Sequence, residues 1–410
     1  MRRTLSGLIL LSSWLALYAQ SAAATTKTTL GTDELEEAVQ QLSKITGLQP
    51  LKKVRQDTIT REGVRKFLEQ KLKEEVKPED IRLEELALKK FGLVPQEFDL
   101  KSATVDLITE QAAAFYDFRT KKLYLLEGDD TASGMAGAQK MIVVHELAHA
   151  LADQHFDLGK FIRKSRSDDA STARMAVMEG QATWLMMESM VAGIGQSMRT
   201  MPSMAELMGT SATEAMASQY PVLAKAPLYL RASLIFPYNQ GLKFQQALVV
   251  KLGNAGFSQV FQKPPVSSQQ ILHPEKYFAG VEPVKPTLPD LPKGWKKIHE
   301  STVGELEHAI LIEQYLSKGD ATDIAPAWKG GSLALVENKA KQTAMLYASE
   351  WDTPENAKRF FDAYIRVLAG KWKKVMVDSD SPAAVTGSGD SVPFSVRLDG
   401  TRVTSAEGLR

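Results

Sequence analysis

The segment QKMIVVHELAHALADQHF, residues 139–156, has the strongest pattern in this chain. It is apolar on nearly every side, which predicts a helix buried inside the protein. His145 and His149 stand four positions apart in it, and Glu146 directly follows the first histidine. A helix turns by about 100° per residue, so the two imidazoles lie about 40° apart on one face. We therefore predict an interior helix that presents two imidazoles and a carboxylate together.

A metal ion is the simplest partner for these three side chains. Without a partner, burying two histidines and a glutamate would cost several kcal/mol, which disfavours a pair of ordinary core histidines. Zinc accepts imidazole ligands and keeps a position open for water in catalytic sites. Glu146 is offset from His145 by about 100°, so its carboxylate would lie beside the ion. There it could accept a proton from a water molecule whose pKa zinc lowers to about 7.

The third ligand has to be a His, Asp or Glu side chain, because the chain has no cysteine and only six histidines. His155 follows His149 by six positions, as in the three-histidine zinc pattern HExxHxxGxxH. That pattern has a glycine where this chain has Ala152. Alanine favours a continuous helix, which would turn His155 away from the face of the other two histidines.

Glu179 is the other candidate for the third ligand. It belongs to a second predicted helix, residues 167–193, with Ser167 or Asp168 as its N-cap. Small residues share its face or adjoin it, namely Ala176, Gly180, Ala182 and Thr183. Such residues let two helices approach closely, as a metal shared between helices requires. We prefer Glu179, and His155 remains the alternative.

These residues resemble the gluzincin metallopeptidases, the thermolysin-like clan, in which HExxH is followed by a glutamate on a second helix. HELAHALADQ, residues 145–154, is similar to the active-site helix of thermolysin. More broadly, the run from FYDFRTKKLYL to MEGQATW resembles a poorly characterised family of secreted bacterial proteins classed as zinc peptidases. The resemblance implies His145, His149 and Glu179 as zinc ligands and Glu146 as the general base.

The resemblance has two further implications. A strand within residues 115–126 is expected to pair with an extended peptide substrate. A His or Tyr side chain is expected to stabilise the oxyanion of the reaction intermediate. We select His273 and Tyr277, in ILHPEKY, as catalytic candidates for this role, and His155 and Tyr116 are alternatives.

The chain departs from the gluzincin pattern in one place. Many members have an aspartate four residues after the glutamate ligand, where it bonds a ligand histidine, and this chain has Thr183 there. The Thr183 hydroxyl could take that role. Asp153, four residues after His149, is another candidate for binding an imidazole N–H.

The N-terminus predicts export from the cytoplasm. Residues 1–24 combine two arginines, a short apolar stretch and a run of small residues, which is typical of a secretory signal peptide. We expect a secreted or periplasmic protein without stable membrane insertion once the signal is removed. The formal net charge of +1 gives no reason to expect nucleic acid as a partner. Oligomeric state stays open.

The overall prediction is an α+β protein that is mostly helical. A gluzincin-like catalytic domain, residues 30–285, would contain the HExxH helix and a small sheet, with a hairpin turn at residues 117–122. A proline-rich linker, residues 286–299, would lead to a small α+β domain, residues 300–410. There we expect strands at residues 328–338 and 341–351.

The C-terminal domain carries two further local signals. A helix is expected to start after Asp352 or Thr353, with Pro354 in its first turn. The dipeptide Asp399-Gly400 predicts a hairpin turn.

We predict a zinc-dependent hydrolase, most simply an endopeptidase that acts on peptides or proteins. Two alternatives remain: a catalytically inactive zinc-binding interaction protein of protease-like fold, and a zinc amidase that acts on cell-wall material.

Overall fold

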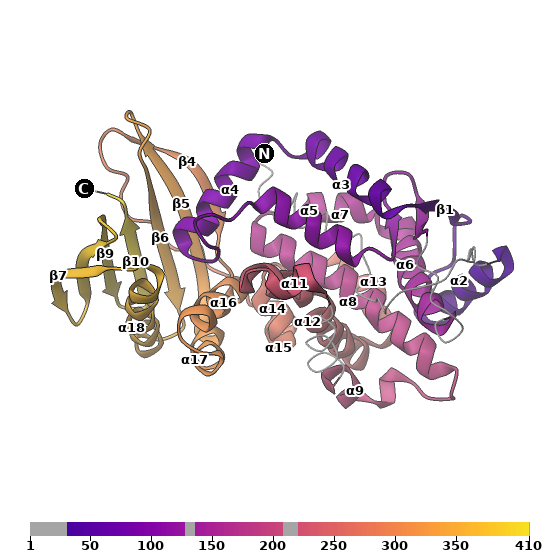
Figure 1. Cartoon of the computed structure of the whole chain (residues 1–410). Coiled ribbons are helices and arrows are strands. Elements are labelled where there is room, and N and C mark those ends of the chain that lie inside the picture. The colour runs from indigo at the N-terminus through magenta and orange to yellow at the C-terminus, as the bar shows by residue number, and fades with distance from the viewer. Residues whose placement is uncertain (1–30, 128–135, 208–219, 410) are drawn as a thin grey trace.

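The computed structural model describes residues 31–127, 136–207 and 220–409 (Figure 1). The expected signal peptide, residues 1–24, lies outside the described residues. In the described part of the chain, no helix combines the length and the apolar character that crossing a membrane requires.

The N-terminal two thirds of the chain is mainly helical (Figure 1). Its helices are α2 (Thr32–Thr46), α3 (Arg61–Glu75), α4 (Pro78–Phe91), α5 (Leu100–Gln111), α6 (Ala136–Phe156), α7 (Leu158–Arg163), α8 (Asp168–Ala192), η1 (Met198–Thr200), α9 (Pro202–Leu207), α11 (Pro221–Lys225), α12 (Leu228–Leu252), η3 (Gly253–Ala255), α13 (Gly256–Gln262), α14 (Ser268–Leu272) and α15 (Pro274–Phe278). The helix predicted around HELAH is α6, and the helix predicted to carry Glu179 is α8.

Local sequence signals set several of these helix ends. The side chains of Thr60, Asp99 and Ser167 accept hydrogen bonds from backbone N–H groups in the first turns of α3, α5 and α8. Ser167 is thus the N-cap of α8, one of the two residues predicted for it. Gly92 ends α4 with a φ of 96°, a left-handed conformation that favours glycine.

A small three-stranded sheet lies beside α6. Its strands are β1 (Arg55–Ile59), β2 (Ala114–Asp117) and β3 (Lys122–Leu126), in the order β1-β3-β2. Strands β2 and β3 form the predicted hairpin, and β1 pairs with β3 in parallel. Sequence analysis did not identify β1, because its residues are mostly polar and exposed and lack an apolar alternation.

The helix α6 is buried on both of its faces. Opposite the histidines, Leu147 and Leu151 share an apolar cluster with Leu42 of α2 and Leu185 of α8. This packing leaves the histidine face of α6 directed at α8 and α12. The sequence predicted that small residues of α8 would let it approach α6.

Helix α8 also packs very closely against α12. A Cβ atom on Gly180 would lie 2.2 Å from the carbonyl of Gly241, and a Cβ atom on Gly241 would lie 2.2 Å from the carbonyl oxygen of Ala176. Two glycines therefore allow α8 and α12 to touch through their backbones, next to the turn that carries Glu179.

The C-terminal part forms a seven-stranded antiparallel sheet at one end of the molecule (Figure 1). Its strands are β4 (Trp295–Thr302), β5 (Trp328–Asn338), β6 (Thr343–Trp351), β7 (Val375–Ser381), β8 (Ala384–Gly389), β9 (Val392–Asp399) and β10 (Arg402–Glu407), in the order β4-β5-β6-β10-β9-β8-β7. Its helices are α16 (Glu305–Tyr315), α17 (Lys318–Ile324), η4 (Ala325–Ala327) and α18 (Pro354–Lys371).

Several C-terminal predictions are confirmed. Strands β5 and β6 match the predicted strand pair, Thr353 caps α18, and Gly400 lies in the turn between β9 and β10. Strand β4 begins at Trp295, inside the segment expected to be a linker. The observed architecture is α+β, with many helices, a small sheet and a C-terminal α+β part, as predicted.

The two parts of the chain share one core. Tyr347 of β6 packs against Phe91 of α4, His308 of α16 and Phe360 of α18. The C-terminal sheet is therefore joined to the helical part through a continuous layer of aromatic rings.

Candidate metal centre

Three side chains predicted as metal ligands meet between α6 and α8. The Nε2 atoms of His145 and His149 lie 3.1 Å apart. The Oε2 atom of Glu179 is 3.1 Å from His145 Nε2 and 3.3 Å from His149 Nε2. All three residues are buried, with at most 2% of their surface exposed. They are the one group of this kind within the described residues that could hold a metal ion.

The spacing of these atoms fits a tetrahedral ion. Zinc–nitrogen and zinc–oxygen bonds of about 2.0–2.1 Å place two tetrahedral ligands about 3.3 Å apart. The three observed separations lie between 3.1 and 3.3 Å. Two imidazoles and one carboxylate also match the ligand set of a catalytic zinc site. The side chains present therefore fit a metal ion.

Glu146 lies beside this group and is not one of its three members. Its Oε2 atom accepts a hydrogen bond of 2.8 Å from the backbone N–H of Tyr116 in β2. Its Oε1 atom is buried and has no hydrogen-bond partner among the residues that the structure describes. One carboxylate oxygen is thus fixed by the strand, and the other can accept a proton or a hydrogen bond from a bound molecule.

Burial dominates the electrostatics of these groups. It raises the pKa of Glu146 to about 8, because a charged carboxylate is poorly solvated there. Burial also lowers the pKa of His145. Burial opposes charge on His149 too, but the Glu179 carboxylate outweighs it and raises the pKa of His149. A neutral imidazole at His145 suits a metal ligand.

Tyr238 of α12 is a part of the site that sequence analysis missed. Its ring stacks on His145 with a centroid distance of 6.1 Å, and its hydroxyl lies beside the Glu179 carboxylate. Burial, together with the Glu179 and Glu146 carboxylates, raises the pKa of Tyr238 well above its usual range. The hydroxyl therefore keeps its proton and is a hydrogen-bond donor. Only the packing of α12 on α8 brings it there.

His155 is turned away from the metal centre formed by His145, His149 and Glu179. Its Nε2 atom lies 2.8 Å from the carbonyl oxygen of Gln49. The helix α6 continues through Ala152 to Phe156, so the chain does not bend back toward His149. This is the outcome expected for a continuous helix.

His273 and Tyr277 do not contact the metal group, contrary to the role we predicted for them. His273 Nε2 lies 2.8 Å from Glu305 Oε1, and the Tyr277 hydroxyl donates to the carbonyl of Lys263. The preceding helix α14 is held by Asp169, whose carboxylate accepts the N–H of Ser268. Asp169 is ten residues before Glu179, or about 15 Å along α8, which explains the separation.

Asp153 binds other partners than an imidazole. Its carboxylate accepts hydrogen bonds from the Tyr116 hydroxyl, the Lys121 ammonium group and the Leu158 backbone N–H. The Thr183 hydroxyl is buried, and no described residue forms a hydrogen bond with it. Asp153 therefore binds the β2–β3 hairpin and not a histidine. The Thr183 hydroxyl can still accept or donate a hydrogen bond.

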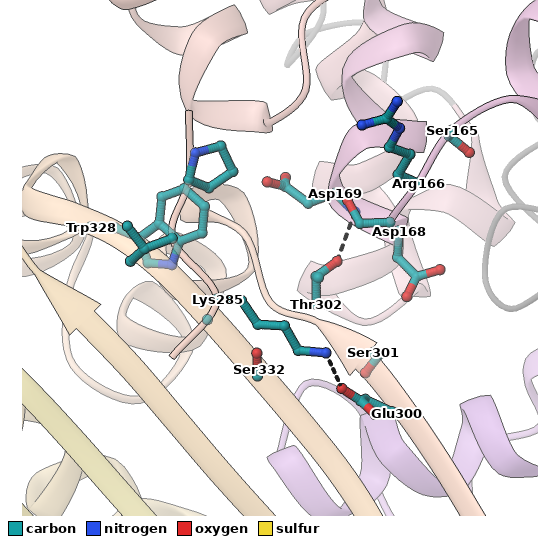
Figure 2. Close-up of a pocket in the computed structure, with 14 residues that line it drawn as sticks. Ser165, Arg166, Asp168, Asp169, Lys285, Glu300, Ser301, Thr302, Trp328 and Ser332 are labelled. Carbon is teal, nitrogen blue, oxygen red and sulfur yellow. Dashed lines mark hydrogen bonds and ion pairs between the residues drawn. The ribbon is translucent and has the colours of Figure 1, made fainter. Parts of the chain in front are cut away.

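A cavity of about 500 Å³ lies elsewhere, between the first turn of α8 and strands β4 and β5 (Figure 2). Several of its polar groups have partners within the protein. Lys285 and Glu300 form an ion pair of 2.6 Å, and the Asp169 N–H donates to the Thr302 hydroxyl. The cavity is therefore a feature of the junction between the two parts of the chain and not of the metal centre.

Comparison with known proteins bears on the C-terminal part alone. A family described as a domain of unknown function (DUF8575) matches residues 291–410, which include the seven-stranded sheet and helices α16–α18. No curated protein and no solved structure matches the chain. The metal centre lies outside the matched residues.

Proposed function

We propose that this protein is a zinc-dependent endopeptidase of gluzincin type. The proposal is carried by a buried His-His-Glu group with the Glu146 carboxylate beside it. One Glu146 oxygen is fixed by a hydrogen bond, and the other has no partner in the described part of the chain. A purely structural zinc site has no need of such a carboxylate. The signal-peptide pattern of residues 1–24 supports action outside the cytoplasm.

In this proposal His145, His149 and Glu179 hold the ion. Bound zinc would supply a Lewis acid and would lower the pKa of a water molecule to about 7. Glu146 accepts a proton from water at its Oε1 atom and later delivers that proton to the leaving amine. Burial raises the pKa of Glu146, which strengthens its carboxylate as the proton acceptor in the first transfer.

Tyr238 takes the role that sequence analysis gave to His273 and Tyr277. Its protonated hydroxyl lies beside Glu179 and close to Glu146. From there it can donate a hydrogen bond to the oxyanion that forms when water attacks a carbonyl carbon.

Strand β2 supports a peptide substrate. It is an edge strand whose one neighbour in the sheet is β3. In an antiparallel pair the backbone groups of alternate residues point to opposite sides. The N–H of Leu126 donates to the Ala113 carbonyl, so Ala114 and Tyr116 direct their backbone groups away from β3. The Tyr116 N–H is taken by Glu146, which leaves the Ala114 groups and the Tyr116 carbonyl for a substrate. An extended peptide could pair with this edge.

The test compares wild type with Glu146→Gln and Glu179→Ala, and uses His155→Ala as a matched control on α6. Zinc content is measured by elemental analysis and hydrolysis with casein and a peptide library. We expect about one zinc per chain in wild type, Glu146→Gln and His155→Ala, and a loss in Glu179→Ala. Glu146→Gln should lower kcat by about a hundredfold or more, because the proton acceptor is removed.

Equal hydrolysis by wild type and Glu146→Gln would refute this mechanism. Bound zinc with no hydrolysis of any peptide would instead favour a binding protein. Cleavage of cell-wall amides without cleavage of peptides would favour an amidase.

A further inference from the structure

The hairpin of β2 and β3 is fixed to its surroundings on two sides. On one side Lys121 and Tyr116 contact α6, and on the other side the turn contacts α3. Both contacts centre on a carboxylate that is almost fully buried, Asp153 in α6 and Asp117 in the turn. This arrangement affects Glu146, the proposed general base, because the Tyr116 N–H of β2 donates a hydrogen bond to its carboxylate.

Tyr116 forms hydrogen bonds with α6 at two points. Its backbone N–H donates to Glu146 and its hydroxyl donates to Asp153 Oδ2 at 3.0 Å. Glu146 and Asp153 are seven residues apart, so they lie on nearly the same side of α6, about 10 Å apart along its axis. One tyrosine therefore fixes both the position of β2 along the helix and its distance from the helix.

Asp153 has further partners that hold it in place. The Lys121 ammonium group donates to the same Oδ2 atom at 2.6 Å, and the Leu158 N–H donates to Oδ1 at 3.0 Å. Lys121 has a φ of 57°, which is disfavoured for a residue other than glycine. The hairpin turn keeps this conformation with the lysine directed at Asp153.

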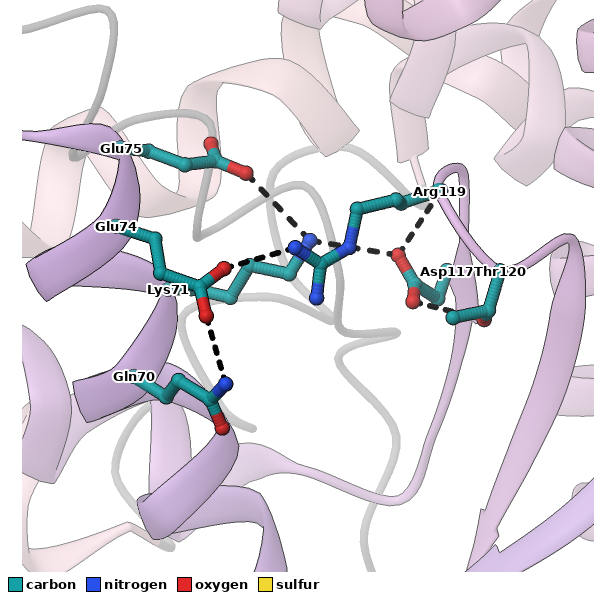
Figure 3. Close-up of polar contacts among 7 residues, drawn as sticks. All are labelled: Gln70, Lys71, Glu74, Glu75, Asp117, Arg119 and Thr120. Atoms are coloured by element: carbon teal, nitrogen blue, oxygen red, sulfur yellow. Dashed lines mark hydrogen bonds and ion pairs between the residues drawn. The ribbon is translucent and has the colours of Figure 1, made fainter.

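The second buried carboxylate fixes the other side of the hairpin (Figure 3). Asp117 accepts hydrogen bonds from the Arg119 N–H and the Thr120 hydroxyl, and its side chain lies 3.6 Å from the Lys71 ammonium group of α3. Arg119 also bonds Glu74 of α3. The hairpin is thus held between α3 and α6, and it cannot shift along α6 without breaking a buried charged contact.

We propose that Asp153 is a positioning residue for the general base. It acts through Tyr116. By holding the tyrosine hydroxyl, Asp153 maintains the hydrogen bond from the Tyr116 N–H to Glu146 Oε2. This bond keeps Glu146 Oε1 facing the metal centre. The proposal rests on the function proposed above for Glu146.

The test uses Tyr116→Phe, which removes the hydroxyl and leaves the backbone N–H, and Asp153→Asn. The matched control is Tyr315→Phe, which removes a hydroxyl that donates to the Gly92 carbonyl, away from the metal centre. In full-length protein, Tyr116→Phe and Asp153→Asn should lower kcat by about 10- to 100-fold, as the loss of an outer partner of a metal site typically does. KM and zinc content should stay near wild type.

Two comparisons separate positioning from a general loss of structure. Lys121→Arg should retain most of the activity that Lys121→Met loses, because arginine can still donate to Asp153. Equal kcat in Tyr116→Phe and Tyr315→Phe, or a loss of activity that only follows a loss of zinc, would overturn the proposal.

Hydrogen exchange tests the same proposal independently of activity. Amides of residues 114–117 should exchange faster in Asp153→Asn than in wild type or Tyr315→Phe. Unchanged exchange would overturn the proposal. If wild type binds zinc, cleaves nothing and yet shows this faster exchange in the variant, the hairpin contact stands and the peptidase function fails.

Discussion

At the scale of single residues, most members of the candidate site can be predicted from the sequence, but Tyr238 cannot. His145, Glu146 and His149 are set by their spacing on one helix, and Glu179 was recognised from its small neighbours and from the resemblance to gluzincins. Tyr238 carries no such mark, because a tyrosine after Pro237 in an apolar helix is most simply a core residue. The role that we propose for it rests on its position beside His145 and Glu179.

Tyr238→Phe tests this assignment. The variant keeps the ring that stacks on His145 and removes the hydroxyl donor, so we expect kcat to fall by about a hundredfold with zinc still bound. Tyr364→Phe is the control, since it removes a buried hydroxyl that donates to Glu407 in the C-terminal sheet. Steady-state kinetics and zinc analysis on both variants decide the question, and similar kcat values in the two would exclude Tyr238 from the reaction.

At the scale of elements, the position of α8 decides whether the metal centre exists. This helix supplies Glu179 to α6 on one side and contacts α12 through Gly180 on the other. A helix with a bulkier residue at position 180 would be pushed away from α12. The mid-helix glycine indicated close packing, but its partner in that packing could not be read from the sequence.

Gly180→Ala should therefore be strongly destabilising. The added methyl would lie 2.2 Å from the Gly241 backbone, and neither helix backbone can yield easily. We expect a loss of about 3 kcal/mol in the free energy of unfolding, at the upper end of typical overpacking. Gly319→Ala is the control, because the nearest atom to its added Cβ is 3.7 Å away. Denaturant unfolding measures both, and equal stability of the two variants would contradict the proposed contact.

At the scale of the whole molecule, several buried acids lie where α8 meets the C-terminal part. Burial raises the pKa of Asp169 to about 6 and that of Glu307 to about 8. Nearby carboxylates add to both shifts: Glu305 and Asp168 act on Asp169, and Asp169 acts on Glu307. Asp168, Glu305 and His273 belong to the same junction. The first turn of the ligand-bearing helix is thus packed against the C-terminal part through carboxyl groups that favour their neutral forms.

This junction predicts a stability that falls as pH rises. In the unfolded chain Asp and Glu side chains lose their protons near pH 4. In the folded protein Asp169 and Glu307 keep their protons to a higher pH. Between about pH 4 and pH 8 the folded state binds more protons, so its stability decreases with increasing pH. At constant zinc, we expect the Tm to drop on the order of 5 °C from pH 5.5 to pH 8.5.

Thermal unfolding of Glu307→Gln checks this prediction. Glutamine can still accept the Gly304 N–H that Glu307 accepts in the capping box of α16. The variant should show a smaller drop in Tm across the same pH range. Glu300→Gln, which changes a partly exposed and ion-paired acid, should keep the wild-type drop. A wild-type slope in Glu307→Gln would contradict our account of the junction.

The sequence by itself determined what depends on neighbours along the chain. Helical periodicity placed both histidines on one face of α6, turn residues located the β2–β3 hairpin, and capping residues located the starts of α8 and α18. These features follow from local backbone geometry. The same reasoning selected His273 and Tyr277 for the oxyanion without information on distances between elements, and in the structure these side chains contact Glu305 and Lys263.

Only the tertiary structure decided which elements meet. It placed Tyr238 beside the metal centre and packed Gly180 against Gly241. It also made Asp153 a hydrogen-bond partner of Tyr116 instead of an imidazole. It also placed α14 at the far end of α8, which removed His273 from the site. The physical reason is that such contacts arise from the packing of apolar faces over long chain separations, and many packings are compatible with the same local pattern.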